Sequence, residues 1–207
     1  MFIPRNMEMT DDQAIIDFIN EFGFGLMVSP LLDATHVPMQ YQEDPQNGMR
    51  YLYGHLAKIN PQWKDSVGER VLAVFSGPHA YISPTWYAGQ PAVPTWNYTA
   101  VHCYGTLELL NAEQMAVSMD ELVTQYEPAL HQNSELMPAE YKQKLAKAVV
   151  GFRIEIDTIQ AQEKLDQQRR PADQQGVYEA LSTSAHSGAV ELANYMKKRN
   201  LGTGRGA

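Results

Sequence analysis

The chain has 207 residues, of which 44% are hydrophobic and 19% are charged, and its formal net charge is −8 at pH 7. This length and composition predict a folded, soluble protein of one domain, or of one domain with an appendage, and they exclude a disordered chain. The acidic balance argues against a large phosphate-tracking surface, because DNA affinity depends mainly on Lys and Arg side chains.

The first quarter of the chain predicts one helix followed by three strands. Thr10 and Gln13 have the spacing of a capping box, and apolar residues then recur at helical spacing as far as Phe22. Apolar runs, alternating residues and a turn at Asn47-Gly48 predict the strands that follow. The strands span residues 24–29, 35–42 and 50–55.

The middle of the chain predicts two short strands, an aromatic loop and one long strand. A tight turn at Gly77-Pro78 separates the short strands, and Gly105 marks a bulge or a close approach within the long one. The loop over residues 84–96 carries more Trp and Tyr side chains than a simple connector needs. The strands span residues 70–76, 80–83 and 98–110.

The rest of the chain predicts helices and one more strand. Asn111 and Gln114 are expected to cap the first of these helices. After Asp157 the sequence becomes rich in Gln. The expected elements are helices over 111–126, 138–148 and 188–199, a strand over 150–157, and a flexible tail over 202–207.

This order of elements predicts a small antiparallel β-barrel. The strands are interrupted by helices and do not alternate with them, which disfavours a doubly wound parallel sheet. No G-x-G-x-x-G sequence follows a strand and no Walker loop is present. The usual dinucleotide and nucleoside triphosphate cradles are therefore missing.

Ring-bearing side chains gather between residues 54 and 105, where the three Trp residues lie with few acidic neighbours. Such a segment suits a planar, polar ligand. At its start, Lys58, Asn60 and Gln62 place ammonium and amide donors at a strand end, which suits a phosphate or the polar edge of a ring. The alternative is a surface turn packed by Trp63.

A second motif spans residues 93–102. Trp96 and Tyr98 could stack on a flat heterocycle while Asn97 reads its edge, and Tyr98 and His102 share one strand face. An aromatic plug for the barrel is the alternative. His79, beside a Gly-Pro pair, is expected to bond a nearby carbonyl group.

Other chemistries are disfavoured. The histidines show no metal-ligand spacing, so no metal site is expected. Cys103 is the only cysteine and alternates away from His102, and no nucleophile elbow is present. The sequence begins without a signal peptide and contains no apolar run of about 20 residues, which predicts a cytoplasmic protein with no membrane span.

Four blocks of the sequence resemble the PaiB-type FMN-binding negative transcriptional regulators. The similarity extends from Met1-Phe2-Ile3-Pro4 to about Arg169, and departs from the family where Asp166-Gln167-Gln168 replaces a Ser-Gln-Asn sequence. The blocks are Ala34–Pro38, Gly54–Trp63, Phe75–Tyr87 and Val93–Gly105.

The resemblance implies a mainly β protein, an FMN-binding split barrel of six antiparallel strands in a Greek-key-like order with peripheral helices. It also implies a homodimer that holds FMN at the subunit interface. The expected domains are a split barrel over 1–170 and a helical extension with a tail over 171–207. The implied FMN-binding residues are Thr35, His36, His55, Lys58 and Asn60 on the phosphate and ribityl side, and Trp96, Asn97, Tyr98 and His102 nearer the ring or the partner subunit.

Three functions stay open at this point. The first is a flavin-dependent negative transcriptional regulator that acts as a homodimer. The second is an FMN-dependent oxidoreductase resembling pyridoxamine-phosphate oxidase or flavin reductases, so enzyme activity is undecided. The third is a repressor that binds DNA directly through an arm ending in Lys197-Lys198-Arg199, which the acidic charge and the lack of a helix-turn-helix pattern support only weakly.

Overall fold

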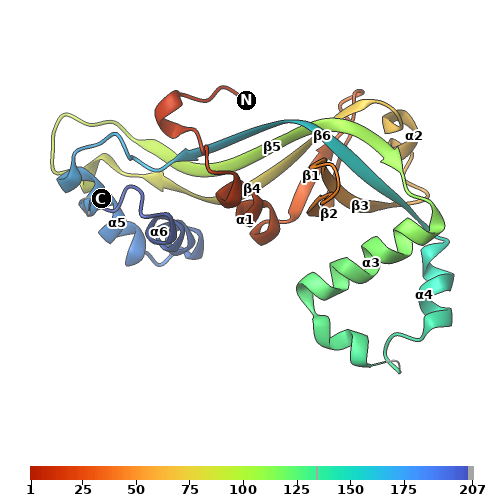
Figure 1. Cartoon of the computed structure of the whole chain (residues 1–207). Coiled ribbons are helices and arrows are strands. Elements are labelled where there is room, and N and C mark those ends of the chain that lie inside the picture. Colours follow the sequence, from red (N-terminus) through yellow and green to blue (C-terminus); the bar gives the residue numbers. More distant parts are fainter. Residues whose placement is uncertain (134, 205–207) are drawn as a thin grey trace. The chain divides into compact units, whose positions relative to one another are not determined.

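The computed structural model describes residues 1–133 and 135–204, and its elements are labelled in Figure 1. Its contacts divide the chain into two compact units. The barrel unit comprises Ile16–Phe75 and His102–Ile159, and the terminal unit comprises Met1–Ile15, Ser76–Val101 and Gln160–Ala207. The domain boundary expected at residue 170 stays a prediction.

The strands form a closed barrel in the order β1-β2-β3-β6-β5-β4, which confirms the predicted six-stranded fold. Four of its strand pairs are antiparallel: β1 with β2, β2 with β3, β3 with β6, and β1 with β4, the pair that closes the barrel. The strands are β1 (Phe24–Val28), β2 (Ala34–Glu43), β3 (Arg50–Ala57), β4 (Arg70–Ile82), β5 (Thr95–Leu109) and β6 (Val149–Lys164).

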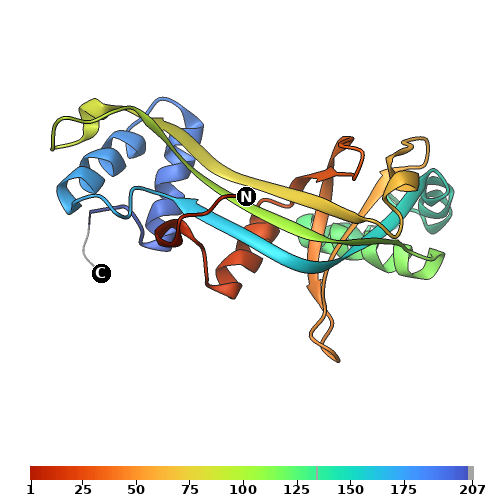
Figure 2. The ribbon, with the colours of Figure 1, turned by 90° about the horizontal axis from the view of Figure 1, so that it is seen from above.

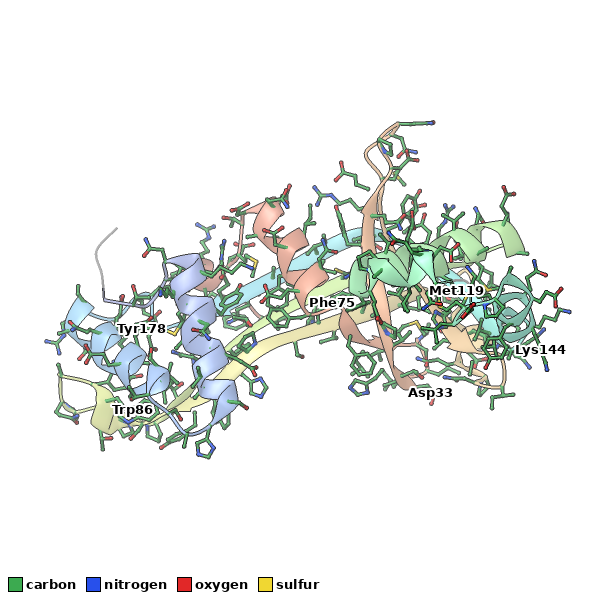
Figure 3. All side chains as sticks on the ribbon, turned by 90° about the horizontal axis from the view of Figure 1, so that it is seen from below. Asp33, Phe75, Trp86, Met119, Lys144 and Tyr178 are labelled. Carbon is green, nitrogen blue, oxygen red and sulfur yellow. The ribbon has the colours of Figure 1, made fainter. Side chains whose placement is uncertain are left out.

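Alternating residues of these strands fill the interior of the barrel unit. Phe75, labelled in Figure 3, is fully buried there, as are Leu52 and Phe152. Cys103 is also buried, and burial raises the pKa of its thiol to about 12. The thiol therefore stays protonated at neutral pH and behaves as a small apolar core group.

Strand β4 differs from the prediction, because one continuous strand replaces two short ones. The turn expected at Gly77-Pro78 is wrong: both residues are buried within β4. The fixed φ of proline is compatible with an extended backbone, and the Pro78 carbonyl accepts a hydrogen bond from Thr99 Oγ1 at 3.2 Å.

The helices predicted over 111–126, 138–148 and 188–199 are present, whereas residues 62–66, expected to be part of a turn, form a short helix. Asn111 and Gln114 form the expected capping box of α3. The first helix begins one residue later than expected, because the Asp11 carboxylate accepts from the backbone N–H groups of Gln13 and Ala14. The helices are α1 (Asp12–Glu21), α2 (Gln62–Ser66), α3 (Ala112–Tyr126), α4 (Ala139–Ala146), α5 (Pro171–Ser182) and α6 (Ser187–Arg199), with short 3₁₀ turns at Arg5–Met7, Pro84–Trp86 and Pro128–Gln132.

In the terminal unit, α5 and α6 lie side by side (Figure 2). The anchor of α6 is the buried Glu163 of β6, which accepts from Tyr195 Oη at 2.9 Å and from Arg199 Nε and Nη2 at 2.8 and 3.0 Å. The Arg199 guanidinium donates two N–H groups to one carboxylate. This pairing fixes the orientation of α6 and neutralises the buried charge of Glu163.

The flexible tail expected over 202–207 is wrong for residues 202–204. Gly202 and Thr203 are buried, and the Gly204 N–H donates to Gln174 Oε1 at 3.2 Å. The remaining residues of that prediction, 205–207, lie outside the described residues. Within residues 1–133 and 135–204, no helix has the length and apolar character needed to cross a bilayer.

We expect Gly105→Ala to destabilise the barrel unit. A Cβ at this position would lie 2.1 Å from the Glu155 carbonyl oxygen, so the close approach predicted from the sequence leaves no room for a methyl group. The free energy of unfolding in urea should fall by about 2 kcal/mol. Gly188→Ala is the control, because its Cβ would meet nothing nearer than the His79 carbonyl oxygen at 3.7 Å. Equal stability of the two variants would contradict the expectation.

Candidate functional site

Thr35 and Asn60 are brought together at the ends of β2 and β3 by the buried side chain of Gln62. Thr35 Oγ1 donates to Gln62 Oε1, and Asn60 Nδ2 donates to Thr35 Oγ1 at 3.0 Å. The Gln62 N–H donates to Asn60 Oδ1 at 3.0 Å. These polar groups therefore satisfy one another, and they fix the shape of the turn between β3 and α2.

Gln62 also ties this turn to the β1–β2 connection. Its side chain is 2% exposed, and its Nε2 donates to the carbonyl oxygens of Met27 at 3.1 Å and of Asp33 at 2.8 Å (Asp33 is labelled in Figure 3). The sequence marked Gln62 only as one of several donors. Its central position depends on residues about 30 positions away along the chain, which no local pattern reveals.

Lys58 lies in the same turn with its backbone held and its side chain available. Its N–H donates to the Ala148 carbonyl at 2.8 Å, and its carbonyl accepts from Trp63 Nε1 at 3.2 Å. Within the described part of the chain, its Nζ makes no hydrogen bond or ion pair. A held backbone with a free ammonium group is suited to binding an anion.

The two neighbouring histidines have different surroundings. His55, on β3, is half-buried, and burial lowers the pKa of its imidazole. It is therefore neutral at pH 7 and can donate or accept a hydrogen bond but brings no charge. His36, on β2, is exposed, and its ring stacks on Phe24 with the centroids 5.9 Å apart.

Trp96 and Tyr98, on the first part of β5, lie in the terminal unit. Trp96 is exposed, and its ring centroid is 6.3 Å from that of His79 and 6.2 Å from that of Tyr81. His79 Nδ1 also lies 3.2 Å from the Gly77 carbonyl oxygen, as expected for a histidine beside this Gly-Pro pair. Tyr98 Oη donates to Gln162 Oε1 at 3.0 Å.

Asn97 faces the opposite side of β5 from Trp96 and Tyr98. It is 0% exposed, and neither amide atom has a hydrogen-bond partner among the described residues. A buried amide with two unmet hydrogen-bonding atoms is costly, so it marks a place where a further polar group belongs.

His102 lies further along β5, in the barrel unit. Its ring is 6.4 Å from that of Tyr104, and its Nδ1 is buried without a partner in the described part of the chain. Burial lowers the pKa of His102, so the ring is neutral at pH 7. Within residues 1–133 and 135–204, no cluster of His, Cys, Asp and Glu side chains could hold a metal ion.

The aromatic loop before β5 is anchored by the segment that follows β6. Tyr87 Oη donates to the buried Asp166 at 3.1 Å, and the Arg169 guanidinium lies 4.6 Å from the Tyr87 ring centroid. The Gly89 N–H donates to Asp173 Oδ1 at 2.9 Å. Asp166 and Arg169 therefore hold the loop in place.

Comparison with known proteins identifies relatives of the whole chain. The family model described as "Putative FMN-binding domain" matches residues 1–158. The chain is 35% identical over 209 residues to the Bacillus subtilis protein "Protease synthase and sporulation protein PAI 2", covering 96% of this chain and 98% of that protein.

Solved structures support the fold. The flavocytochrome Anf3 from Azotobacter vinelandii matches with a TM-score of 0.56 and 13% identity, over 78% of this chain and 72% of that one. A protein from Bacteroides thetaiotaomicron titled "putative 5-nitroimidazole antibiotic resistance protein" matches with a TM-score of 0.51 and 15% identity, over 75% and 85% of the two chains. At these identities the likeness shows the fold alone.

The Tyr87 anchor predicts a stability change at high pH. Burial, with the Asp166 carboxylate beside it, raises the pKa of Tyr87 from 10.0 to about 12. A phenol whose pKa is raised by folding stabilises the folded state fully below about pH 10, and this contribution is lost as the pH rises to about 12. In an ultraviolet titration of Tyr87→Phe, the tyrosine that ionises at the highest pH should be missing. The free energy of unfolding of this variant should also depend less on pH between about pH 10 and 12.

Tyr126→Phe is the matched control, because Tyr126 is exposed. An unchanged titration of Tyr87→Phe would show that another tyrosine ionises last.

Proposed function

The chain belongs to the PaiB-type FMN-binding family, and from this premise we propose that it acts in the cytoplasm as a flavin-dependent negative transcriptional regulator that works as a homodimer. The observation that carries the proposal is the 35% identity with PAI 2 along nearly the full length of both chains. FMN is the cofactor of this family.

The side chains of the barrel unit fit the phosphate end of FMN. A phosphate needs cationic charge and hydrogen-bond donors, and Lys58 supplies an ammonium group without a partner among the described residues. Thr35 and Asn60 are bonded to each other and to Gln62, so we assign them to shaping the turn that presents Lys58. His36 and His55 lie on the adjoining strands and can add hydrogen bonds.

The ring end of FMN needs flat apolar surfaces and polar groups for the edge of the isoalloxazine. Trp96 and Tyr98 offer such rings, and the family resemblance assigns them to the isoalloxazine or to the partner subunit. His102 lies on the same face of β5 as Trp96 and Tyr98, and its buried Nδ1, which has no partner among the described residues, has the chemistry to meet the ring edge. The amide of Asn97 has the donor and acceptor atoms for a ring edge too, but it lies on the other face of β5. When bound, FMN supplies redox chemistry, while these side chains bind and orient it.

The surroundings of the basic clusters favour a regulator that signals to a partner over one that tracks DNA directly. Arg199 is paired with the buried Glu163, and Arg170 Nε donates to Asp173 at 3.2 Å. The guanidinium of Arg169 lies over the Tyr87 ring. The net charge of −8 adds electrostatic repulsion from phosphates. If the purified protein shifted DNA fragments in a gel at low salt, direct DNA binding would be supported instead.

A transcript measurement tests the regulator role. Deleting the gene from its host should raise the level of a defined set of transcripts, and expressing the wild-type protein again should restore repression. Lys58→Ala, expressed at the same level, should restore it only partly if bound FMN is required. Unchanged transcripts, together with sustained NAD(P)H oxidation by the purified flavoprotein, would favour the oxidoreductase instead.

A binding measurement tests the placement of the phosphate. Lys58→Ala removes the free ammonium group and should weaken FMN binding at least about tenfold, since a hydrogen bond to a charged group contributes about 1.5–3 kcal/mol. Lys64→Ala, six residues on and with its ammonium 5.6 Å from the Trp63 ring centroid, is the control and should bind FMN like the wild type. Equal affinity of both variants in a fluorescence titration would place the phosphate elsewhere.

A further inference from the structure

Helix α3 is held to the rest of the barrel unit along one side. Gln40 Nε2 donates to the Glu121 carbonyl at 3.0 Å, and Gln42 Nε2 donates to the Glu121 carboxylate. One turn further, Gln125 Nε2 donates to the Asn20 carbonyl at 3.1 Å. Residues 121 and 125 thus face β2 and α1, and a different side of α3 is left for α4.

The side of α3 that faces α4 is apolar but not filled. Ala116, Met119 and Val123 follow one another at helical spacing along it (Met119 is labelled in Figure 3). The only buried residue of α3 is Ser118, and α4 has none. The two helices therefore do not close a core between them.

A cavity of about 430 Å³ lies in this place, within the barrel unit. Large apolar side chains on its wall stay uncovered: Leu136 is 65% exposed, Tyr141 55% and Leu145 48%. Ligand pockets in proteins measure about 300–1,000 Å³, so the cavity has the volume of a site for a small molecule. None of the residues assigned to FMN lines it.

The side chains that line the cavity indicate which kind of ligand it would bind. Asp120 Oδ1 and Lys142 Nζ lie 3.1 Å apart, both about half exposed, so the charges that line the cavity neutralise each other. Met119 and Met137 are flexible and polarisable, and they adapt to different apolar shapes. The Tyr141 hydroxyl can meet one polar group. A charged ligand would lose its hydration here without gaining a free partner.

From these contacts we propose that the space between α3 and α4 is a second ligand site, which binds a small, uncharged, mainly apolar molecule independently of FMN. A concave cavity of this volume fits a compact molecule better than the flat surface of a second copy. The proposal does not rest on the regulator role.

Calorimetry with two ligands of the same ring tests the proposal on the FMN-loaded protein. 2-Naphthol, which is uncharged at pH 7, should bind with a Kd on the order of 0.1 mM. 2-Naphthalenesulfonate, which is anionic, should bind at least about tenfold more weakly, because its charge would be desolvated. Equal affinities for the two molecules, or no heat with 2-naphthol, would overturn the proposal.

Variants locate the bound molecule. Ala116→Phe fills the cavity from α3 and should weaken 2-naphthol binding at least about tenfold, whereas Ala112→Phe, exposed on the same helix and outside the cavity wall, should not. Both variants should keep the visible spectrum of bound FMN. Ala146→Phe fills the cavity from α4 and replaces Ala116→Phe if that variant does not fold.

Two results in these variants would count against a small-molecule site. Unchanged 2-naphthol binding in the cavity-filling variants would place the molecule elsewhere. Loss of a dimer in sedimentation of Ala116→Phe, without 2-naphthol binding in the wild type, would show that a second copy covers this face.

Discussion

The pairing of β1 with both β2 and β4 closes the barrel, and the phosphate-side turn depends on that closure. Gln62 reaches from the start of α2 to the Met27 carbonyl on β1, at the strand where the sheet closes. The same side chain accepts from Thr35 and is held near Asn60. One buried amide thus joins the closing strand, the β1–β2 connection and the turn that carries Lys58, so the position of this cation follows from the closure of the sheet.

The polar residues implicated in FMN binding divide by what they already do for the fold. Thr35 and Asn60 have their hydrogen bonds met internally, which makes them parts of a frame. Among the described residues, Asn97 and His102 hold buried polar atoms that have no partner, which is costly for a group that serves the fold alone. Such groups lower the free energy of unfolding of the free protein, and a bound ligand that pairs with them raises it again.

The strands could be predicted because alternation is local, and the same alternation places Asn97 opposite Trp96 and Tyr98 on β5. Gly105 could be recognised as a close approach because glycine is unusual inside a strand. The continuity of β4 through Pro78 could not, since it depends on the Thr99 hydroxyl that meets the proline carbonyl. The Gln62 network and the space between α3 and α4 could not either, because both join segments distant along the chain.

The buried thiol of Cys103 has a practical consequence for experiments on this protein. Since it is the only cysteine and stays protonated within the barrel, a thiol-reactive dye would find no competing native group on the folded chain. Single cysteines placed on exposed positions of α3, α5 or α6 could then carry paired spectroscopic labels on the natural background. Distances between such labels would report how the two units are arranged, with and without FMN.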